Sequence, residues 1–123
     1  DPPYNQHPYG SNYFMLNLLA DYQEPESISP VSGIPKNWNR SCYNQPKLAE
    51  PALLDLIQRC PAKFILISYN SEGFIHPQSF AAELKRLGRL EILETTYNTF
   101  RGSRNLRNRN LHVKEFLFLL AKA

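Results

Sequence analysis

A short apolar run at residues 63–68 limits the fold more than any other part of the chain. Its sequence, Lys-Phe-Ile-Leu-Ile-Ser, is almost continuously apolar, whereas a strand with one solvated face alternates apolar and polar residues. The run therefore predicts a strand that is covered on both faces. The polar turn predicted after it, at residues 69–73, stands where open α/β sheets place their ligands.

Apolar residues that recur every three or four positions predict helices around this strand. These helices run from Ser11 or Asn12 to about Tyr22, from about Leu48 to Cys60, and from Pro77 to Leu87. Two further strands are predicted at residues 90–100 and 115–120. In a chain of 123 residues, 42% of them hydrophobic, these elements fit a small α/β unit or part of a larger one.

The tetrapeptide Asp1-Pro2-Pro3-Tyr4 is a candidate site for methylation of an exocyclic amino group. Such a nitrogen is a poor nucleophile, so its hydrogens must be held by acceptors, here the Asp1 carboxylate and a prolyl carbonyl. Tyr4 offers a flat face for stacking a base, an interaction worth about 1–3 kcal/mol. The alternative is an ordinary Asp-Pro-Pro turn without chemical function.

The positive charge is concentrated in one part of the chain. The formal net charge is +3, but residues 85–114 hold eight Lys and Arg against Glu91 and Glu94. Four of the arginines, at positions 101, 104, 107 and 109, lie in the predicted loop 101–110. This distribution predicts a surface that binds phosphates, and the alternative is a solvated basic loop.

Cysteine and histidine positions give no indication of a metal site. Cys42 and Cys60 match neither a zinc spacing nor a redox pair, and the three histidines are scattered. We therefore expect no metal and a reduced, cytoplasmic setting. No apolar run is long enough to cross a bilayer, so no membrane association is expected.

Several stretches in the same order resemble the carboxyl-terminal part of DNA adenine-N6 methyltransferases. The resemblance is to the Dam-type class, and more closely to its FokI-methylase-like branch. The stretches are Asp1-Pro2-Pro3-Tyr4-Asn5-Gln6, Tyr9-Gly10-Ser11-Asn12-Tyr13, Leu66-Ile67-Ser68-Tyr69-Asn70-Ser71-Glu72-Gly73, and residues 97–101. Together they extend over nearly the whole chain.

The resemblance implies a Rossmann-like, S-adenosylmethionine-dependent methyltransferase fold with a mixed sheet, whose last strand inserts antiparallel between its two predecessors. By this analogy Asp1 and Pro2 hold the N6 hydrogens of a flipped adenine in double-stranded DNA, Tyr4 stacks on it, and Pro3 completes the catalytic motif. The residues that the analogy places near DNA are Tyr9, Asn12, Tyr13, Arg101, Arg104, Arg107 and Arg109. Residues 23–46, with Trp38, form a long loop that either selects the target or is an irregular surface insertion.

Parts of the family pattern are not found in this sequence. The glycine-rich loop for S-adenosylmethionine and the strand leading into Asp1 are absent, so residues 1–123 are expected to be only the carboxyl-terminal part of the catalytic domain. We expect the isolated chain to be inactive unless another chain supplies the rest. The function expected from the resemblance is DNA adenine methylation in a bacterial restriction–modification system. Alternatives are a non-catalytic nucleic-acid-binding remnant, a subunit of a split enzyme, or methylation of RNA or of a protein glutamine.

Overall fold

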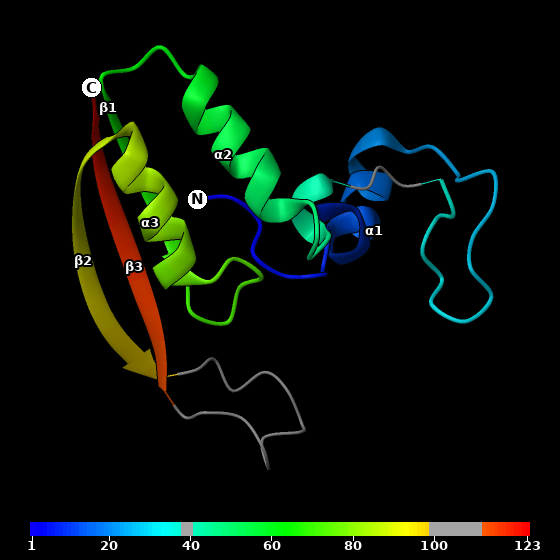
Figure 1. Ribbon diagram of the computed structural model, residues 1–123. Helices are drawn as coiled ribbons and strands as arrows, with labels where there is room; N and C mark the ends of the chain where they lie inside the picture. Colours follow the sequence, from blue (N-terminus) through cyan, green and yellow to red (C-terminus); the bar gives the residue numbers. More distant parts are fainter. Residues whose placement is uncertain (38–40, 99–111) are drawn as a thin grey trace.

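A computed structural model describes residues 1–37, 41–98 and 112–123 of the chain (Figure 1). It contains helices α1 (Tyr9–Asp21), α2 (Ala49–Arg59) and α3 (Pro77–Leu87), the 3-10 turn η1 (Cys42–Asn44), and strands β1 (Phe64–Asn70), β2 (Gly88–Asn98) and β3 (His112–Lys122). The predicted set of helices and strands is therefore confirmed for the residues that the structure describes. None of the described helices is long and apolar enough to span a membrane.

The three strands form one sheet in the order β1-β3-β2. β3 is antiparallel to both neighbours, with Ile67 of β1 and Ile92 of β2 each opposite Phe118 of β3. The expected insertion of the last strand between its two predecessors is thus confirmed. The expected mixed sheet is not confirmed. β1 and β2 run in the same direction, but β3 lies between them, so every strand pair in the described sheet is antiparallel. A wider, Rossmann-like sheet stays a prediction.

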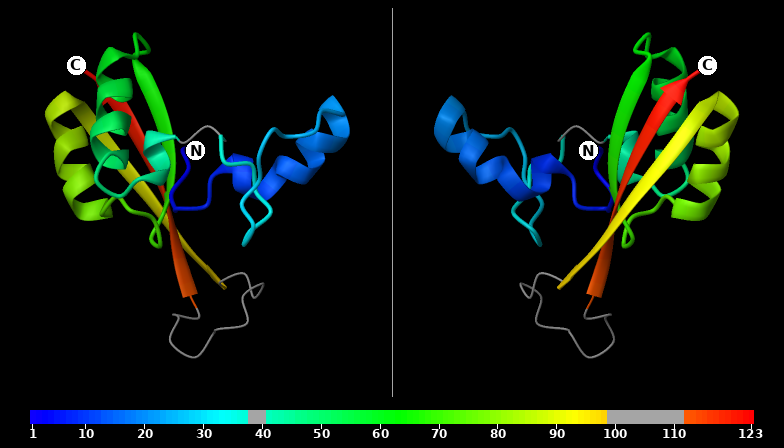
Figure 2. Two further views of the ribbon diagram at one scale, coloured as in Figure 1. Left: turned by 90° about the vertical axis from the view of Figure 1, so that its right-hand side faces the viewer. Right: turned by 90° about the vertical axis from the view of Figure 1, so that its left-hand side faces the viewer.

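Helices α2 and α3 cover one face of this sheet, and the core lies between them (Figure 2). Phe80 of α3 meets Phe118 of β3 edge to face, with ring centroids 5.5 Å apart. The aliphatic and aromatic side chains buried at this interface include Leu53, Ile57, Ile67, Tyr69, Phe80, Leu84, Phe116, Phe118 and Leu120. The helix periodicity of α2 and α3 therefore identified the two faces that make the core.

The opposite face of the sheet exposes several large apolar side chains to solvent. Phe64 and Leu66 of β1 are 64% and 60% exposed, and Leu93 of β2 is 66% exposed. The prediction of a strand covered on both faces is therefore wrong for the part of the chain described here. Successive residues of a strand point to opposite faces, so only one side of β1 meets the helices. Helix α1 stands apart from the sheet and does not cover this face (Figure 2).

The element boundaries differ from the predicted ones by a few residues. Helix α1 begins at Tyr9 instead of Ser11 or Asn12, because Pro8 takes the extended conformation before the helix and the N–H of Ser11 already donates to its carbonyl. β1 continues through Tyr69 and Asn70, which pair with β3, so the polar turn starts at residue 71. β2 begins at residue 88 and β3 at residue 112, both earlier than predicted.

Residues 22–37, which follow α1, have little regular structure. Ile28 and Pro35 form an isolated β-bridge, and Gly33 between them adopts a φ of 68°. Side-chain and backbone contacts of Ser29 with residues 31–34 close the turn. Trp38 lies outside the described residues.

Candidate active site

The tetrapeptide of residues 1–4 lies along the free edge of β1 (Figure 2). Asp1, Pro2 and Pro3 line a groove of about 390 Å³ together with β1 and α2. The other lining residues are Tyr43, Leu53, Leu56, Ile57, Cys60, Ile65, Leu66 and Ile67. Asp1 is exposed. The tetrapeptide therefore meets the strand that the sequence predicts to end at a ligand site.

Tyr4 is fixed to the turn that follows β1. Its carbonyl oxygen accepts a hydrogen bond from the backbone N–H of Phe74, at 3.1 Å. Its ring is packed nearly perpendicular to that of Tyr69, with ring centroids 6.3 Å apart. An edge-to-face pair of this kind contributes about 0.5–1.5 kcal/mol beyond the burial of its surface. The structure thus brings together the tetrapeptide and the turn, two features that are about seventy residues apart.

The turn itself is held by hydrogen bonds at each end. Tyr69, which is 2% exposed, accepts the N–H of Ile75 on its hydroxyl oxygen at 3.2 Å. The side-chain oxygen of Asn70 accepts the N–H of Glu72 at 2.7 Å. Gly73 lies so close to Tyr69 that a Cβ there would overlap the phenol ring. The turn therefore has one well-defined conformation.

A polar cluster spans the three strands at this end of the sheet, on its open face. It consists of Ser68 and Asn70 of β1, Tyr97 of β2 and Glu115 of β3. Glu115 accepts hydrogen bonds from the Ser68 hydroxyl at 3.0 Å and from the Tyr97 hydroxyl at 3.1 Å. The amide nitrogen of Asn70 donates to the Tyr97 oxygen at 2.9 Å and lies 3.5 Å from Glu115.

Tyr97 and Glu115 were missed as functional candidates by the sequence reasoning. Tyr97 begins the stretch 97–101 that carries part of the family resemblance, but neither Tyr97 nor Glu115 was assigned a role in the site. The strand register places both beside Asn70. Burial, the hydrogen bond to Glu115 and the charge of that carboxylate raise the pKa of Tyr97, so the phenol stays a donor. Two indications were available: the polar Ser-Tyr-Asn sequence at the end of an apolar strand, and the resemblance of residues 97–101.

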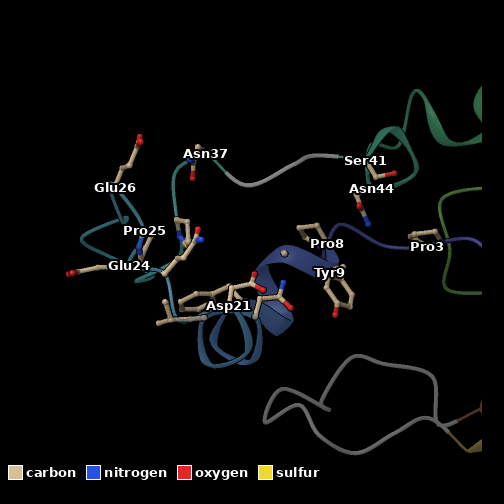
Figure 3. A pocket seen from close by; sticks show the side chains of 16 residues that line it. Pro3, Pro8, Tyr9, Asp21, Glu24, Pro25, Glu26, Asn37, Ser41 and Asn44 are labelled. Carbon is tan, nitrogen blue, oxygen red and sulfur yellow. The ribbon is translucent and has the colours of Figure 1, made fainter.

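Helix α1 carries the predicted DNA contacts Tyr9, Asn12 and Tyr13 on exposed positions. The rings of Tyr9 and Tyr13 stack on each other with centroids 4.8 Å apart. Tyr9 also lines a groove of about 690 Å³, shown in Figure 3, which extends from Pro3 and Asn44 to the far end of α1. The far end is acidic, since Asp21, Glu24 and Glu26 line it. Phosphates are therefore better tolerated at the Tyr9 end.

The four predicted DNA-binding arginines, Arg101, Arg104, Arg107 and Arg109, lie outside the described residues. Three other basic residues of the positive stretch are paired with acids. Arg86 meets Glu83 at 3.0 Å, Lys114 meets Glu94 at 2.6 Å, and Arg89 forms an ion pair with Glu91. The excess positive charge of this stretch therefore rests largely on the four arginines between residues 101 and 110.

Among residues 1–37, 41–98 and 112–123, no three His, Cys, Asp or Glu side chains are grouped so that they could hold a metal ion. Cys42 and Cys60 are both free thiols.

Comparison with known proteins finds relatives along nearly the whole chain. The type II methyltransferase M.NlaIII of Neisseria lactamica is 30% identical over 127 residues, which cover 99% of this chain and 36% of that protein. The type II methyltransferase M.FokI of Planomicrobium okeanokoites is 32% identical over 125 residues, again 99% of this chain but 19% of that protein. The modification methylase StsI of Streptococcus sanguinis is also 32% identical, over 129 residues.

The chain thus spans between about a fifth and about a third of the length of the curated relatives it matches. No family model matches it, and no solved structure does. The resemblance to methyltransferases that the sequence motifs predict, including the FokI-methylase-like branch, is confirmed by these relatives.

Proposed function

We propose that this chain, a relative of type II methyltransferases, is the base-binding part of an enzyme that methylates adenine N6 in DNA within a restriction–modification system. The observation that carries the proposal is the attachment of the tetrapeptide to the turn after β1, through the Tyr4 carbonyl and the Tyr4 ring. This attachment supports the proposal because it anchors Tyr4 to a well-held turn, and a base-modifying site needs its groups held in place.

Each residue of the tetrapeptide has a separate role in this proposal. The Asp1 carboxylate and the Pro2 carbonyl accept the two hydrogens of the adenine amino group, which orients its lone pair and favours the charge that develops on nitrogen. Tyr4 stacks on the extruded base and offsets part of the cost of removing it from the duplex. Pro3 fixes the backbone between them. The proton lost by the methylated nitrogen leaves along the hydrogen bond to Asp1.

S-adenosylmethionine would supply the methyl group as an activated sulfonium. The glycine-rich loop expected for this cofactor is not among the 123 residues, and the relatives are roughly three to five times as long as the aligned region. We therefore assign the cofactor site to polypeptide outside these residues, in the same chain or in a second one. Residues 1–123 would then be inactive by themselves.

DNA would approach along α1 and loop 101–110. Tyr9 would offer its ring at one end of the larger groove, and the exposed side chains of Asn12 and Tyr13 on the same helix would add hydrogen-bonding and stacking groups. Arg101, Arg104, Arg107 and Arg109 would neutralise phosphates, which makes the affinity dependent on salt. The segment 23–46 would contribute to target choice or remain a surface insertion.

A second candidate is nucleic-acid binding without catalysis. The exposed Tyr9 and Tyr13 pair favours it, because stacked aromatic side chains bind bases without chemistry. Both functions predict DNA binding, but only the first requires the carboxylate of Asp1. Methylation of RNA or of a protein glutamine is a further alternative, which is tested by offering the complete enzyme DNA, RNA and protein as methyl acceptors.

The experiment compares Asp1→Ala and Asp1→Asn in the complete enzyme, with these residues joined to the cofactor-binding part. We expect turnover on adenine-containing duplexes to fall by about 100-fold or more while DNA binding is retained. Asp55→Ala is the matched control, because Asp55 is a surface carboxylate of α2 paired with Arg59. Unchanged turnover in Asp1→Ala would remove Asp1 from the reaction. Binding without any methylation by the unmutated enzyme would favour the non-catalytic function.

A further inference from the structure

The polar cluster of Ser68, Asn70, Tyr97 and Glu115 is connected to Tyr4 by a short series of contacts. The side chain of Asn70 is the link between them. Its amide nitrogen donates to Tyr97, while its amide oxygen accepts the N–H of Glu72 in the turn. Because one planar amide makes both contacts, Tyr97 determines which way the Asn70 oxygen points.

The turn transmits this orientation to Tyr4. The backbone carbonyl of Asn70 accepts the N–H of Gly73 at 3.0 Å, and the next residue, Phe74, donates its N–H to the Tyr4 carbonyl. The same turn holds the Tyr69 hydroxyl through Ile75, and the Tyr69 ring packs against the Tyr4 ring. Both the backbone and the ring of Tyr4 are therefore held by the turn that Asn70 closes.

The position of the cluster also separates it from the hydrophobic core. Its four residues lie on the sheet face opposite α2 and α3, so their hydrogen bonds do not hold those helices in place. Asn70 is nevertheless 4% exposed. Its side chain joins the cluster to the turn, because the amide nitrogen donates to Tyr97 and Glu115 while the amide oxygen accepts the N–H of Glu72. The Tyr4 phenol also lies close enough to contribute to the raised pKa of Tyr97.

We propose that Tyr97 and Glu115 are positioning residues for Tyr4: through Asn70 and the turn at residues 71–75 they set the plane of the ring that receives the target base. This inference rests on the proposed function for its effect on methylation, but the orientation of Tyr4 can be tested without it. Neither Tyr97 nor Glu115 is expected to contact the base.

The variants are Tyr97→Phe, which deletes the hydroxyl, and Glu115→Gln, which keeps the shape and retains one acceptor oxygen. The matched control is Tyr22→Phe, at a tyrosine that is 90% exposed beyond the end of α1. In the complete enzyme we expect Tyr97→Phe to lower kcat about twofold to tenfold, as loss of a hydrogen bond does, with the KM for S-adenosylmethionine unchanged. Glu115→Gln should retain more activity than Glu115→Ala.

A double-mutant cycle shows whether Tyr97 acts through Tyr4. If it does, Tyr97→Phe lowers kcat in the unmutated enzyme but has little further effect in a Tyr4→Ala background. If Tyr97→Phe and Tyr4→Ala instead lower kcat by independent factors that multiply in the double mutant, the inference is overturned. A fall in kcat accompanied by an equal rise in the KM for S-adenosylmethionine would also overturn it, since that pattern indicates general damage.

A second readout does not depend on activity. In the 123-residue chain labelled with ¹³C-tyrosine, the ring resonance of Tyr4 should shift in Tyr97→Phe and stay in place in Tyr22→Phe. An unmoved Tyr4 resonance in Tyr97→Phe overturns the inference even if turnover falls. If the unmutated complete enzyme transfers no methyl group, the proposed function fails, while a shift of the Tyr4 resonance still supports the positioning role.

Discussion

Replacement of Gly73 by alanine should displace the buried ring of Tyr69. A Cβ at residue 73 would lie 2.7 Å from Cζ and from the hydroxyl oxygen of Tyr69, and closer still to Cε1. The ring cannot move aside freely, because it is 2% exposed and packed among the core residues under α2 and α3. The overlap must therefore be relieved by moving either the ring or the turn.

The expected cost follows from two effects. Overpacking of a buried site costs about 1–3 kcal/mol. Displacement of the Tyr69 hydroxyl from the N–H of Ile75 removes a hydrogen bond worth about 0.5–1.5 kcal/mol. Gly73→Ala should thus lower the free energy of unfolding by about 1.5–4.5 kcal/mol, a large part of the 5–15 kcal/mol that is typical of a domain.

The assay is urea unfolding of the chain with and without Tyr69→Leu. Once the ring is removed, Gly73→Ala should cost less than half of its value in the unmutated chain. Gly33→Ala is the comparison, because its cost comes from a φ of 68° with no atom within 4 Å of the new Cβ, and Tyr69→Leu should not change it. An equal cost of Gly73→Ala in both backgrounds would refute the assignment of the penalty to the Tyr69 ring.

Three further predictions concern charge. Replacing both Arg104 and Arg107 by alanine should weaken DNA binding and reduce the slope of log affinity against log salt concentration by about 2. An unaltered slope would show that these arginines do not contact phosphates and would favour the alternative of a solvated basic segment. Lys122→Met should lower the free energy of unfolding by about 1 kcal/mol, measured by urea titration, because its ammonium group donates to three carbonyls at the end of α2. Burial raises the pKa of Tyr69, so the Tyr69 phenol ionises in the unfolded chain before it ionises in the folded chain as the pH rises. The contribution of the neutral phenol to the free energy of unfolding is therefore complete below about pH 10 and is lost above it. Tyr69→Phe should reduce the loss of stability at alkaline pH.

Local sequence was enough to predict the elements that build the core. The apolar stripes predict helices from about Leu48 to Cys60 and from Pro77 to Leu87, close to the observed α2 and α3, because both helices bury one face and Cys60-Pro61 ends the first of them. The strand order required more than periodicity. The insertion of β3 between β1 and β2 was inferred from the family resemblance, since pairing partners that are about fifty residues apart leave no local pattern.

The candidate site was only partly predictable for the same reason. The tetrapeptide was recognisable because the chemistry proposed for it needs only adjacent residues. Tyr97 and Glu115 join the site only through strand register, which pairs Asn70 with Glu115 across β1 and β3. The continuous apolar run of β1 was misread as doubly covered, since Phe64 and Leu66 are exposed on the face away from the helices.

The central place of β3 has a consequence for how this sheet can be made. In the sheet that the structure describes, β1 and β2 have no hydrogen bonds to each other, and each pairs only with residues 112–122. At about 5–20 residues per second, a ribosome releases the first two strands on the order of seconds before the third. A nonsense or frameshift mutation upstream of residue 112 therefore removes the β1–β3 and β2–β3 pairings together, whereas loss of an edge strand would remove only one pairing.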